Sequence, residues 1–421
     1  MIPTATTATS ARERMLLAKD AARQIGLLSD ERKRDALLGI AGALETAAAA
    51  IVSANDEDLR RGRANGLSDG LLDRLRLDDV RVAALAAAVR DVAALPDPVG
   101  RVLDERVLPS GVRLQKVSVP FGVVGSIYEA RPNVTVDIAA LALRSGNAVV
   151  LRGGTAAERS NAALVAVMRD GLAAQGIDPE AIQTVDDFGR EGAHELMNAR
   201  GIVDVLVPRG SAQLIETVVT ESSVPVIETG AGVVHIVLDE SAPLEWARDI
   251  VVNAKVQRPS VCNAVETVLV VGEASRLVGP VVEALQDAGV TVHGDAAVAA
   301  LAPGIVPATE ADWETEYMSL DLAMHAVADL DEALEHIRRY STHHTESIIT
   351  ADDANAERFL AEVDSAVVMA NASTRFTDGG EFGFGAEVGI STQKLHARGP
   401  MGLAELTSTK WLARGSGQVR A

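Results

Sequence analysis

The sequence predicts an α/β protein with two parallel sheets in succession and a helical segment in front of them. Short apolar runs alternate with amphipathic stretches from about residue 120 to residue 370, and this alternation restarts after Gly232. Before residue 95, apolar residues recur at helical spacing instead. Strands that alternate with helices are joined by right-handed crossovers, which place the strands in a parallel sheet.

The segment in front of the sheets is predicted to be helical. Apolar residues recur every three or four positions from Leu16 to Ile25 and again from Leu37 to Leu44, a spacing that gives a helix one apolar face. Ser29 precedes the second stretch and is a suitable N-cap. Leu-Pro-Asp-Pro at residues 95–98 ends the helical pattern.

A hairpin is expected directly after this break, because Pro-Ser-Gly at residues 109–111 provides a turn between strands at 101–108 and 112–119. The first sheet is then expected to take strands at residues 122–127, 148–151, 204–207 and 224–227, with helices at 136–145, 156–175 and 211–220. The second is expected to take strands at residues 233–238, 264–271, 290–293, 322–327, 347–350 and 366–369, with helices at 243–256, 275–288, 330–340 and 354–363. The chain passes from one sheet to the other near residues 228–232.

Composition narrows the class of function. The chain has 421 residues, enough for two or three domains. Lys and Arg number 39 against 59 Asp and Glu, a formal net charge of −20 that repels polyanions, so we expect no binding of nucleic acid or of a membrane. Aromatic residues make up 3%, too few for a base-stacking surface. The site of an anionic substrate would have to supply its own local cations.

The cysteine content and the N-terminal residues indicate the cellular compartment of the protein. Cys262 is the only cysteine, which excludes an intrachain disulfide and fits a reducing compartment. No run of 18 apolar residues is present, and residues 1–10 lack the apolar core of a secretion signal. The sequence therefore predicts a cytoplasmic protein with a short frayed N-terminal tail.

Several common catalytic signatures are absent from the sequence. It contains no P-loop, no His-Glu-x-x-His, no Gly-x-Ser-x-Gly and no Cys-x-x-Cys. Gly230 and Gly232 are followed by His235 where the third glycine of the dinucleotide fingerprint would stand, so a conventional Rossmann dehydrogenase is not supported. Candidate site residues must be sought at the ends of the predicted strands.

Two of these candidates could act in covalent or acid–base chemistry. Cys262 lies directly before a predicted strand, where a loop exposes a nucleophile, and Asn263, Ser260 and backbone amides there can stabilise a thiolate or an oxyanion. The alternative for a lone cysteine is a buried small apolar residue. Glu228 follows another predicted strand beside glycines and is a general-base candidate, with a helix cap or a surface acid as the alternative.

Two further loops at predicted strand ends suit phosphate groups. A cation followed by glycines opens a helix in each case, where backbone amides can bind phosphate, although ordinary strand–helix turns have the same composition. The residues are Arg152, Gly153, Gly154 and Thr155 in the first loop, and Arg209, Gly210 and Ser211 in the second.

Three other segments carry polar or flexible residues. In residues 129–133, Arg131 can hold a carboxylate or phosphate and Asn133 can donate to an oxyanion, although a surface turn would look the same. His343 and His344 are adjacent and point apart, so without a third ligand we expect solvent-exposed side chains and no metal site. Residues 371–389 hold five Gly and three Phe, a loop typical of the neighbourhood of a site.

Together these motifs resemble those of the aldehyde dehydrogenase superfamily. Cys262, Glu228, Asn133 and the two glycine loops match it, and the 34 positions from Glu228 to Cys262 are close to its spacing of base and nucleophile. More closely, the sequence is similar to the gamma-glutamyl phosphate reductase family, also called glutamate-5-semialdehyde dehydrogenases. This similarity runs from about residue 10 to 412 and is carried by residues 119–135, 145–154, 224–230, 260–264, 315–317 and 380–392. Tyr-Glu-Ala-Arg-Pro-Asn at 128–133 and Glu-Phe-Gly-Phe-Gly-Ala-Glu at 381–387 are specific to the reductases.

The resemblance implies an aldehyde dehydrogenase-like α/β fold with two Rossmann-like parallel-sheet domains and a small β oligomerisation element. It places the cofactor-binding domain at residues 1–100 and 120–230, and the catalytic domain at residues 231–392. Residues 101–119 and 393–421 would form the oligomerisation element, in which the hairpin pairs with a C-terminal strand. The implied assembly is a homodimer or a higher homo-oligomer, with a functional pairing to glutamate 5-kinase.

The implied reaction is the NADPH-dependent reduction of L-glutamyl 5-phosphate to L-glutamate 5-semialdehyde with phosphate release, the second step of proline biosynthesis from glutamate. Cys262 would form a thioester, Asn133 would hold the oxyanion, and Glu228 aligns with the base that hydrolytic relatives use. The implied cofactor residues are Arg152, Gly153, Gly154, Arg209, Gly210, Ser211 and Glu316, and the substrate residues are Glu129, Arg131 and Arg258. A hydrolytic aldehyde dehydrogenase and a non-enzymatic module with the same fold remain as alternatives.

Overall fold

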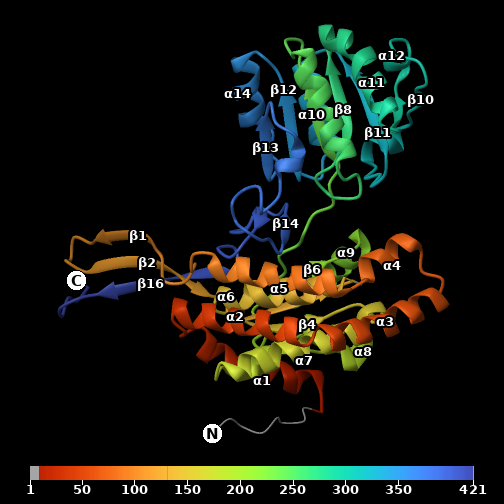
Figure 1. Ribbon diagram of the computed structural model, residues 1–421. Helices are drawn as coiled ribbons and strands as arrows, with labels where there is room; N and C mark the ends of the chain where they lie inside the picture. Colours follow the sequence, from red (N-terminus) through yellow and green to blue (C-terminus); the bar gives the residue numbers. More distant parts are fainter. Residues whose placement is uncertain (1–8, 130, 421) are drawn as a thin grey trace. The chain divides into compact units, whose positions relative to one another are not determined.

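The computed structural model describes residues 9–129 and 131–420 (Figure 1). The chain forms two compact units, the first from residues up to 228 with 383–389 and 401–421, the second from residues 229–382 with 390–400. Most of the predicted N-terminal tail lies outside the described residues. At its end, Ser10 caps α1 (Ala11–Ile25) by accepting a hydrogen bond from the Glu13 amide.

The first unit contains a four-stranded parallel sheet in the order β5-β4-β3-β6. Its strands are β3 (Val123–Tyr128), β4 (Ala148–Arg152), β5 (Ile182–Thr184) and β6 (Val205–Arg209). Its helices are α1, α2 (Asp30–Thr46), α3 (Ala48–Ala64), α4 (Asp69–Leu75), α5 (Asp79–Ala94), α6 (Pro132–Arg144), α7 (Glu158–Ala174), α8 (Gly189–Met197) and α9 (Ala212–Glu221). The helical character predicted before residue 95 is confirmed by α1 to α5.

The helices in front of the sheet follow from local sequence. The predicted N-cap Ser29 accepts a hydrogen bond from the Arg32 amide at 3.3 Å, and Leu37 and Leu44 of α2 are fully buried, as the apolar spacing requires. No single helix in the described part of the chain is long and apolar enough to cross a membrane. The bent pair α2 and α3 passes that test together, by length and composition alone.

Two predicted elements of the first unit differ from the structure. Residues 224–227 were expected to form a strand, but only an isolated parallel bridge joins Val226 to Leu206. Pro225 has no N–H to donate, so a regular ladder cannot continue along this edge, although its carbonyl accepts from the Leu206 amide at 2.8 Å. Helix α6 begins at Pro132 rather than at residue 136, because the fixed φ of proline suits the first helical position.

A separate three-stranded antiparallel sheet in the order β1-β2-β16 belongs to the first unit. Strands β1 (Val102–Val107) and β2 (Arg113–Pro120) form the predicted hairpin, and β16 (Thr407–Arg414) pairs with β2 along its whole length. This is the pairing of hairpin and C-terminal strand that the resemblance implied. Its role in oligomerisation stays a prediction.

The second unit contains a seven-stranded parallel sheet in the order β10-β9-β11-β8-β7-β12-β13. Its strands are β7 (Val234–Leu238), β8 (Val265–Val271), β9 (Thr291–Gly294), β10 (Val306–Pro307), β11 (Asp321–Val327), β12 (Thr345–Ile349) and β13 (Val367–Ala370). Its helices are α10 (Leu244–Val256), α11 (Val278–Asp287), α12 (Ala296–Ala299), α13 (Leu330–Tyr340) and α14 (Asp353–Glu362). The short pair β14 (Gly389–Ser391) and β15 (Gly399–Met401) lies where the chain passes between the two units.

Helices cover both faces of the second sheet (Figure 1). Every residue of β8 is buried, and its side chains alternate between two apolar cores. Val268 and Val270 pack with residues of α10 and α11, whereas Leu269 and Val271 pack with residues of α13 and α14. Successive residues of a strand point to opposite faces, so a strand covered on both sides needs an apolar residue at nearly every position.

A group of histidines packs beside this sheet, of which His235 and His336 are buried and His325 is half-buried. The ring of His336 on α13 lies 5.4 Å from that of His235, 5.3 Å from that of His325 and 4.6 Å from that of Tyr340. Burial, and then the charges of His235 and His325, lower the pKa of His336 to about 3. The His336 Nε2 atom has no hydrogen-bond partner among the described residues, so a proton added there would leave a buried charge without a partner.

We expect acid to destabilise the protein through His336. An unfolded histidine has a pKa of about 6.5, whereas folded His336 stays neutral down to about 3. Between these pH values the unfolded chain binds more protons, so the free energy of unfolding falls as the pH falls from 6.5 towards 3. His336→Phe retains an aromatic ring without the titration and should flatten this fall.

The measurement is urea denaturation of the two proteins at pH 7 and pH 4.5. His194→Gln serves as the control, because His194 is exposed on α8. An unchanged pH dependence in His336→Phe would contradict the assignment.

Candidate active site

Cys262 lies in a turn between α10 and β8, at the amino end of β8, and is half-buried. The Ala264 amide donates to the Val261 carbonyl at 3.0 Å and closes the turn. Asn263 anchors it, since its Nδ2 donates to the Thr377 carbonyl at 2.9 Å and its own carbonyl accepts from Thr374 Oγ1 at 2.8 Å. The glycine-rich loop at residues 371–389 therefore holds the cysteine turn in place.

The segment after Glu228 packs directly against this turn. A Cβ atom on Gly232 would lie 1.6 Å from the Cys262 carbonyl oxygen, so only glycine fits there. The Gly232 amide donates to Glu316 Oε1 at 2.7 Å. Gly232 thus serves a close backbone approach to Cys262, whereas a Cβ on Gly230 would meet the Thr392 side chain at 2.4 Å. The bond to Gly232 places Glu316 beside the cysteine turn.

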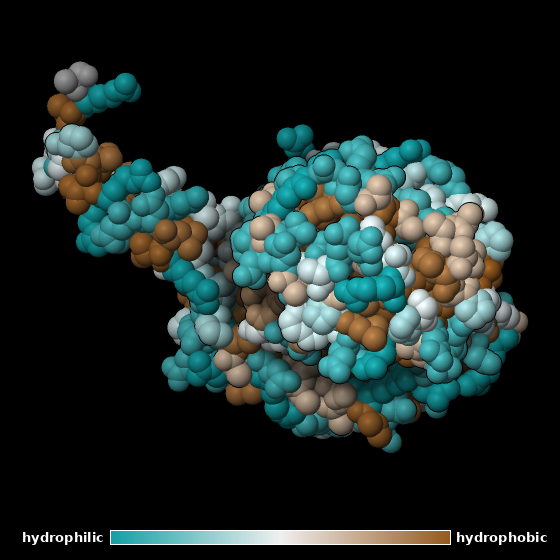
Figure 2. All heavy atoms as spheres, turned by 90° about the horizontal axis from the view of Figure 1, so that it is seen from above, coloured by the Kyte–Doolittle hydropathy of each residue, from teal (hydrophilic) through white to brown (hydrophobic). Residues whose placement is uncertain are grey.

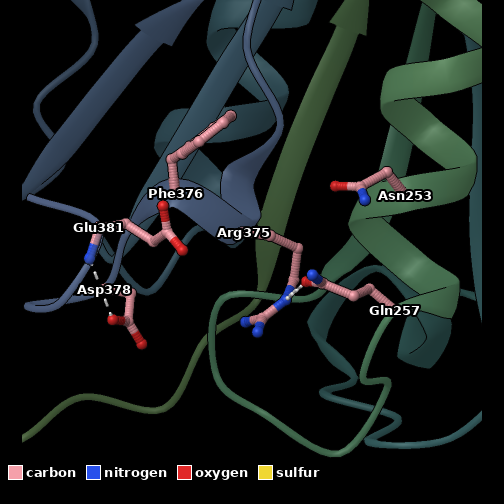
Figure 3. Close-up of a pocket in the computed structure, with 6 residues that line it drawn as sticks. All are labelled: Asn253, Gln257, Arg375, Phe376, Asp378 and Glu381. Atoms are coloured by element: carbon pink, nitrogen blue, oxygen red, sulfur yellow. Dashed lines mark hydrogen bonds between the residues drawn. The ribbon is translucent and has the colours of Figure 1, made fainter.

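Arg375 is a site residue that the sequence did not single out. Its Nε donates to Gln257 Oε1 at 2.8 Å (Figure 3). Its Nη1 donates to Oδ1 of Asn263, the residue after Cys262. Burial lowers the pKa of Arg375, and the charges of Asp378 and Cys262 oppose that shift. The only sequence signal was its place in the glycine-rich loop, because no periodic pattern marks a residue in irregular backbone.

A pocket of about 200 Å³ opens beside the cysteine turn (Figure 3). Two elements line it, α10 and the glycine-rich loop, and all of its lining residues are polar or charged except Phe376. These residues are Asn253, Gln257, Arg375, Phe376, Asp378 and Glu381. The charges of Cys262 and Arg258 both act on Arg375, so two cations lie in the region of the thiol.

A buried ion pair lies under the same end of the second sheet. Lys255 on α10 and Glu266 on β8 are fully buried, with Nζ and Oε2 2.6 Å apart. Burial raises the pKa of Glu266 and lowers that of Lys255, and the charge of Glu316 raises the Glu266 pKa further. Removing one partner of such a pair would leave the other as an unpaired charge in the core. The pair therefore fixes α10 and β8 on either side of the cysteine turn.

The first glycine loop lies at the carboxyl ends of β4 and β5. The Gly153 amide donates to Asp186 Oδ1 at 2.7 Å, and a Cβ on Gly153 would lie 2.0 Å from Asn161 Nδ2. Arg152 donates from Nη1 to the Gly153 carbonyl at 2.6 Å, but its buried Nε has no partner among the described residues. The glycine is thus required for packing, and the arginine retains capacity for an anion.

The second glycine loop meets Glu129 at the carboxyl end of β3. Ser211 caps α9 through the Leu214 amide and donates from its hydroxyl to Glu129 Oε1 at 2.7 Å. A Cβ on Gly210 would lie 2.8 Å from the Glu129 carboxyl carbon. The carboxylate of Glu129 therefore lies at the amino end of α9, the position that favours negative charge.

Asn133 and Arg131 lie at the start of α6. Arg131 is its N-cap residue, and Asn133 is exposed in the first turn, where its Nδ2 donates to Asp137 Oδ2 at 3.1 Å. Burial raises the pKa of Asp137 to about 6, opposed by the bond from Asn133 and the charge of Arg209. Asp137 therefore orients the amide that we predict as an oxyanion donor.

The structure divides the predicted site between the two units. Asn133, Glu129, Arg131 and both glycine loops belong to the first unit, of which Glu228 is the last residue before the second begins. Cys262, Arg258 and Glu316 belong to the second unit. The residues of the first unit lie at the carboxyl ends of its strands, the usual ligand edge of such sheets, whereas Cys262 lies at the amino end of its strand.

The histidine pair corrects one expectation. His343 is exposed as expected, but His344 is fully buried, with its Nδ1 2.9 Å from Thr345 Oγ1. The chain turns into buried strand β12 at residue 345, which draws the preceding side chain into the core. Among the described residues, no three His, Cys, Asp or Glu side chains form a group that could hold a metal ion.

The chain has the fold of the aldehyde dehydrogenase superfamily. A solved acetylating aldehyde dehydrogenase from Geobacillus thermoglucosidasius has the same fold, with a TM-score of 0.69 over 98% of this chain and 97% of that chain, at 16% identity. No protein-family model matches the sequence.

Within that superfamily, the chain belongs to the gamma-glutamyl phosphate reductase family. The reductase of Leifsonia xyli is 63% identical over 422 residues, covering 100% of both chains, and that of Geobacillus thermodenitrificans is 52% identical over 96% of this chain and 97% of its own length. The crystal structure of the Thermotoga maritima reductase has a TM-score of 0.96 at 43% identity, covering 98% of this chain and 100% of that chain. The resemblance inferred from the sequence is confirmed.

We expect Gly232→Ala to disable the cysteine turn. The added methyl group would overlap the Cys262 carbonyl oxygen, so the backbone of one segment must move. The measurement is the rate of alkylation of Cys262, the sole thiol, by iodoacetamide, together with the melting temperature. Gly279→Ala is the control, because the nearest atom to its added Cβ is 3.7 Å away. Alkylation at the parental rate in Gly232→Ala would show that this contact does not position the nucleophile.

Proposed function

We propose that this protein catalyses the NADPH-dependent reduction of L-glutamyl 5-phosphate to L-glutamate 5-semialdehyde, with phosphate release, in proline biosynthesis. The observation that carries the proposal is the Cys262 turn, a half-buried thiol held by backbone contacts in a region that contains Arg258 and Arg375. The names of the relatives support this substrate class. The cations explain how a chain with a net charge of −20 would accept an anionic acyl phosphate.

The chemistry begins at the Cys262 sulfur. Its thiolate attacks the activated carbonyl carbon, a C–S bond forms, and the C–O bond to phosphate breaks with its electron pair leaving on phosphate. When bound, NADPH would supply the hydride that reduces the resulting thioester carbonyl. The C–S bond then breaks, which frees the aldehyde and returns the electron pair to the sulfur. Asn133, held by Asp137, is proposed to donate to the carbonyl oxygen in both steps.

The first unit fits the cofactor. The buried Nε of Arg152 lacks a partner among the described side chains, and a guanidinium there suits the 2′-phosphate that distinguishes NADPH from NADH. Arg209, Gly210 and Ser211 open α9, whose amino end favours a second anionic group. Glu129 occupies that end and would have to move aside for a phosphate. Gly153, Gly154 and Glu316 complete the proposed cofactor set.

The three-stranded sheet is proposed to make the protein a homo-oligomer. Its two edge strands, β1 and β16, leave backbone groups unpaired within the sheet. Leu103, Val107 and Trp411 are 56%, 69% and 49% exposed, and Figure 2 shows hydrophobic side chains along this extension of the first unit. Because an acyl phosphate hydrolyses readily, direct supply by glutamate 5-kinase is proposed as well.

Dependence on phosphate tests the proposed reaction. Run backwards, a reductase that expels phosphate must accept it, so semialdehyde oxidation with NADP+ should require phosphate. We expect NADPH formation to be strong with phosphate and near background in phosphate-free buffer. Equal rates in the two buffers would show that water is the acceptor and would exclude the proposed reaction.

Two substitutions separate the nucleophile from a hydrolytic base. Cys262→Ala should abolish phosphate-dependent oxidation while leaving cofactor binding intact. Glu228→Gln should slow the same reaction far less, because no water molecule needs activation. The comparison is made on initial rates at saturating phosphate. Near-parental activity in Cys262→Ala would rule out the thioester route.

A substitution of Arg152 tests whether this residue binds the 2′-phosphate of NADPH. Arg152→Ala should weaken NADPH binding about tenfold, the loss of one charge-assisted hydrogen bond, and NADH binding much less. Fluorescence titration with each cofactor measures both. Arg159→Ala is the matched control, an exposed arginine of the same unit. Equal losses for the two cofactors would place the 2′-phosphate elsewhere.

A further inference from the structure

The pocket beside Cys262 carries charges of both signs. Arg375 provides a cation, Asp378 and Glu381 provide two carboxylates, and the amides of Asn253 and Gln257 on α10 face them (Figure 3). A site built for phosphate alone would exclude carboxylates, because like charges repel. The composition fits a ligand that is itself zwitterionic.

The cation is held in a defined orientation. Arg375 donates to Gln257 Oε1 at 2.8 Å and also to Asn263 Oδ1. Both of these partners are neutral amides, so they fix the guanidinium plane without cancelling its charge. A planar guanidinium fixed in this way matches the geometry of a carboxylate.

The carboxylates are held by a tight turn. Asp378 Oδ1 accepts from the Gly380 amide at 2.8 Å and from the Glu381 amide at 3.4 Å, which places both acids on one short loop (Figure 3). A Cβ on Gly380 would lie 3.0 Å from Asp378 Oδ1, so glycine leaves room for this turn. Phe376 is 51% exposed and gives the pocket one apolar wall.

We propose that this pocket binds the α-carbon head of an α-amino acid substrate, the α-carboxylate on Arg375 and the α-ammonium on Asp378 and Glu381. The assignment rests on the proposed function and names the residues that select its amino acid substrate. The two side-chain methylenes lie against Phe376, and the chain then reaches the nucleophile.

The reach of the substrate agrees with this placement. The α-carbon and the reacting carbon of a glutamyl chain are three bonds apart, about 4 Å when extended. Arg375 is bonded to Asn263, the residue next to Cys262. A head group on Arg375 therefore leaves the reacting carbon at the cysteine turn, with Arg258 available to the phosphate.

The test is calorimetric titration of the Cys262→Ala protein with three probes. L-glutamate carries both head charges, glutarate lacks the ammonium and 4-aminobutyrate lacks the α-carboxylate. We expect L-glutamate to bind most tightly. Adding Glu381→Gln should weaken the binding of L-glutamate and of 4-aminobutyrate about five- to tenfold, since only the ammonium contact is lost. The affinity for glutarate should stay unchanged.

Arg375→Lys should show the opposite selectivity. It should weaken the binding of L-glutamate and of glutarate by a similar factor, because the point charge of lysine replaces the planar guanidinium that pairs with a carboxylate. The affinity for 4-aminobutyrate should not change. Glu335→Gln is the control, an exposed acid of α13 in the same unit. Equal affinity for all three probes, or the same loss for all three in Glu381→Gln, would overturn the assignment.

The titration involves no turnover, so its outcome is independent of the proposed reaction. If oxidation needs no phosphate while the probes follow the expected pattern, the proposed reaction fails and the pocket assignment holds. If oxidation needs phosphate but the probes do not discriminate, only the pocket assignment fails.

Discussion

The close approach of Gly232 to the Cys262 carbonyl is the constraint on which the proposed chemistry depends. No side chain fits between the two segments, since even a Cβ would lie 1.6 Å from that oxygen. The contact locks the amino ends of β7 and β8 together, and Glu316 holds the Gly232 amide from the other side. A nucleophile whose turn is fixed by backbone contacts keeps its geometry while substrate and product exchange.

The charges around this contact would allow an acidic protein to accept the proposed anionic substrate. With a net charge of −20, the chain as a whole repels anions, so cations must act at short range. Arg258 and Arg375 lie in the same region as Cys262, and Asp378 keeps that region from being uniformly positive. The acids add selectivity, because they favour a ligand with an ammonium group over a simple anion.

The sequence predicted much of the fold, because apolar patterning is a local signal. The alternation of buried and amphipathic stretches located β7, β8, α10 and α13 within a few residues. It failed at residues 224–227, where composition suits a strand but Pro225 cannot complete the ladder. It also failed at His344, which enters the core only because β12 begins at the next residue.

The sequence by itself determined the family and predicted Cys262 as the nucleophile, since both are carried by motifs of consecutive residues. Only the tertiary structure showed that Gly232 serves a close approach and that Arg375 joins the cysteine turn. Arg375 and Asn263 are 112 residues apart in sequence, and Gly232 and Glu316 are 84 apart. Contacts over such separations are set by strand order and by the return path of a long loop, which no local pattern encodes.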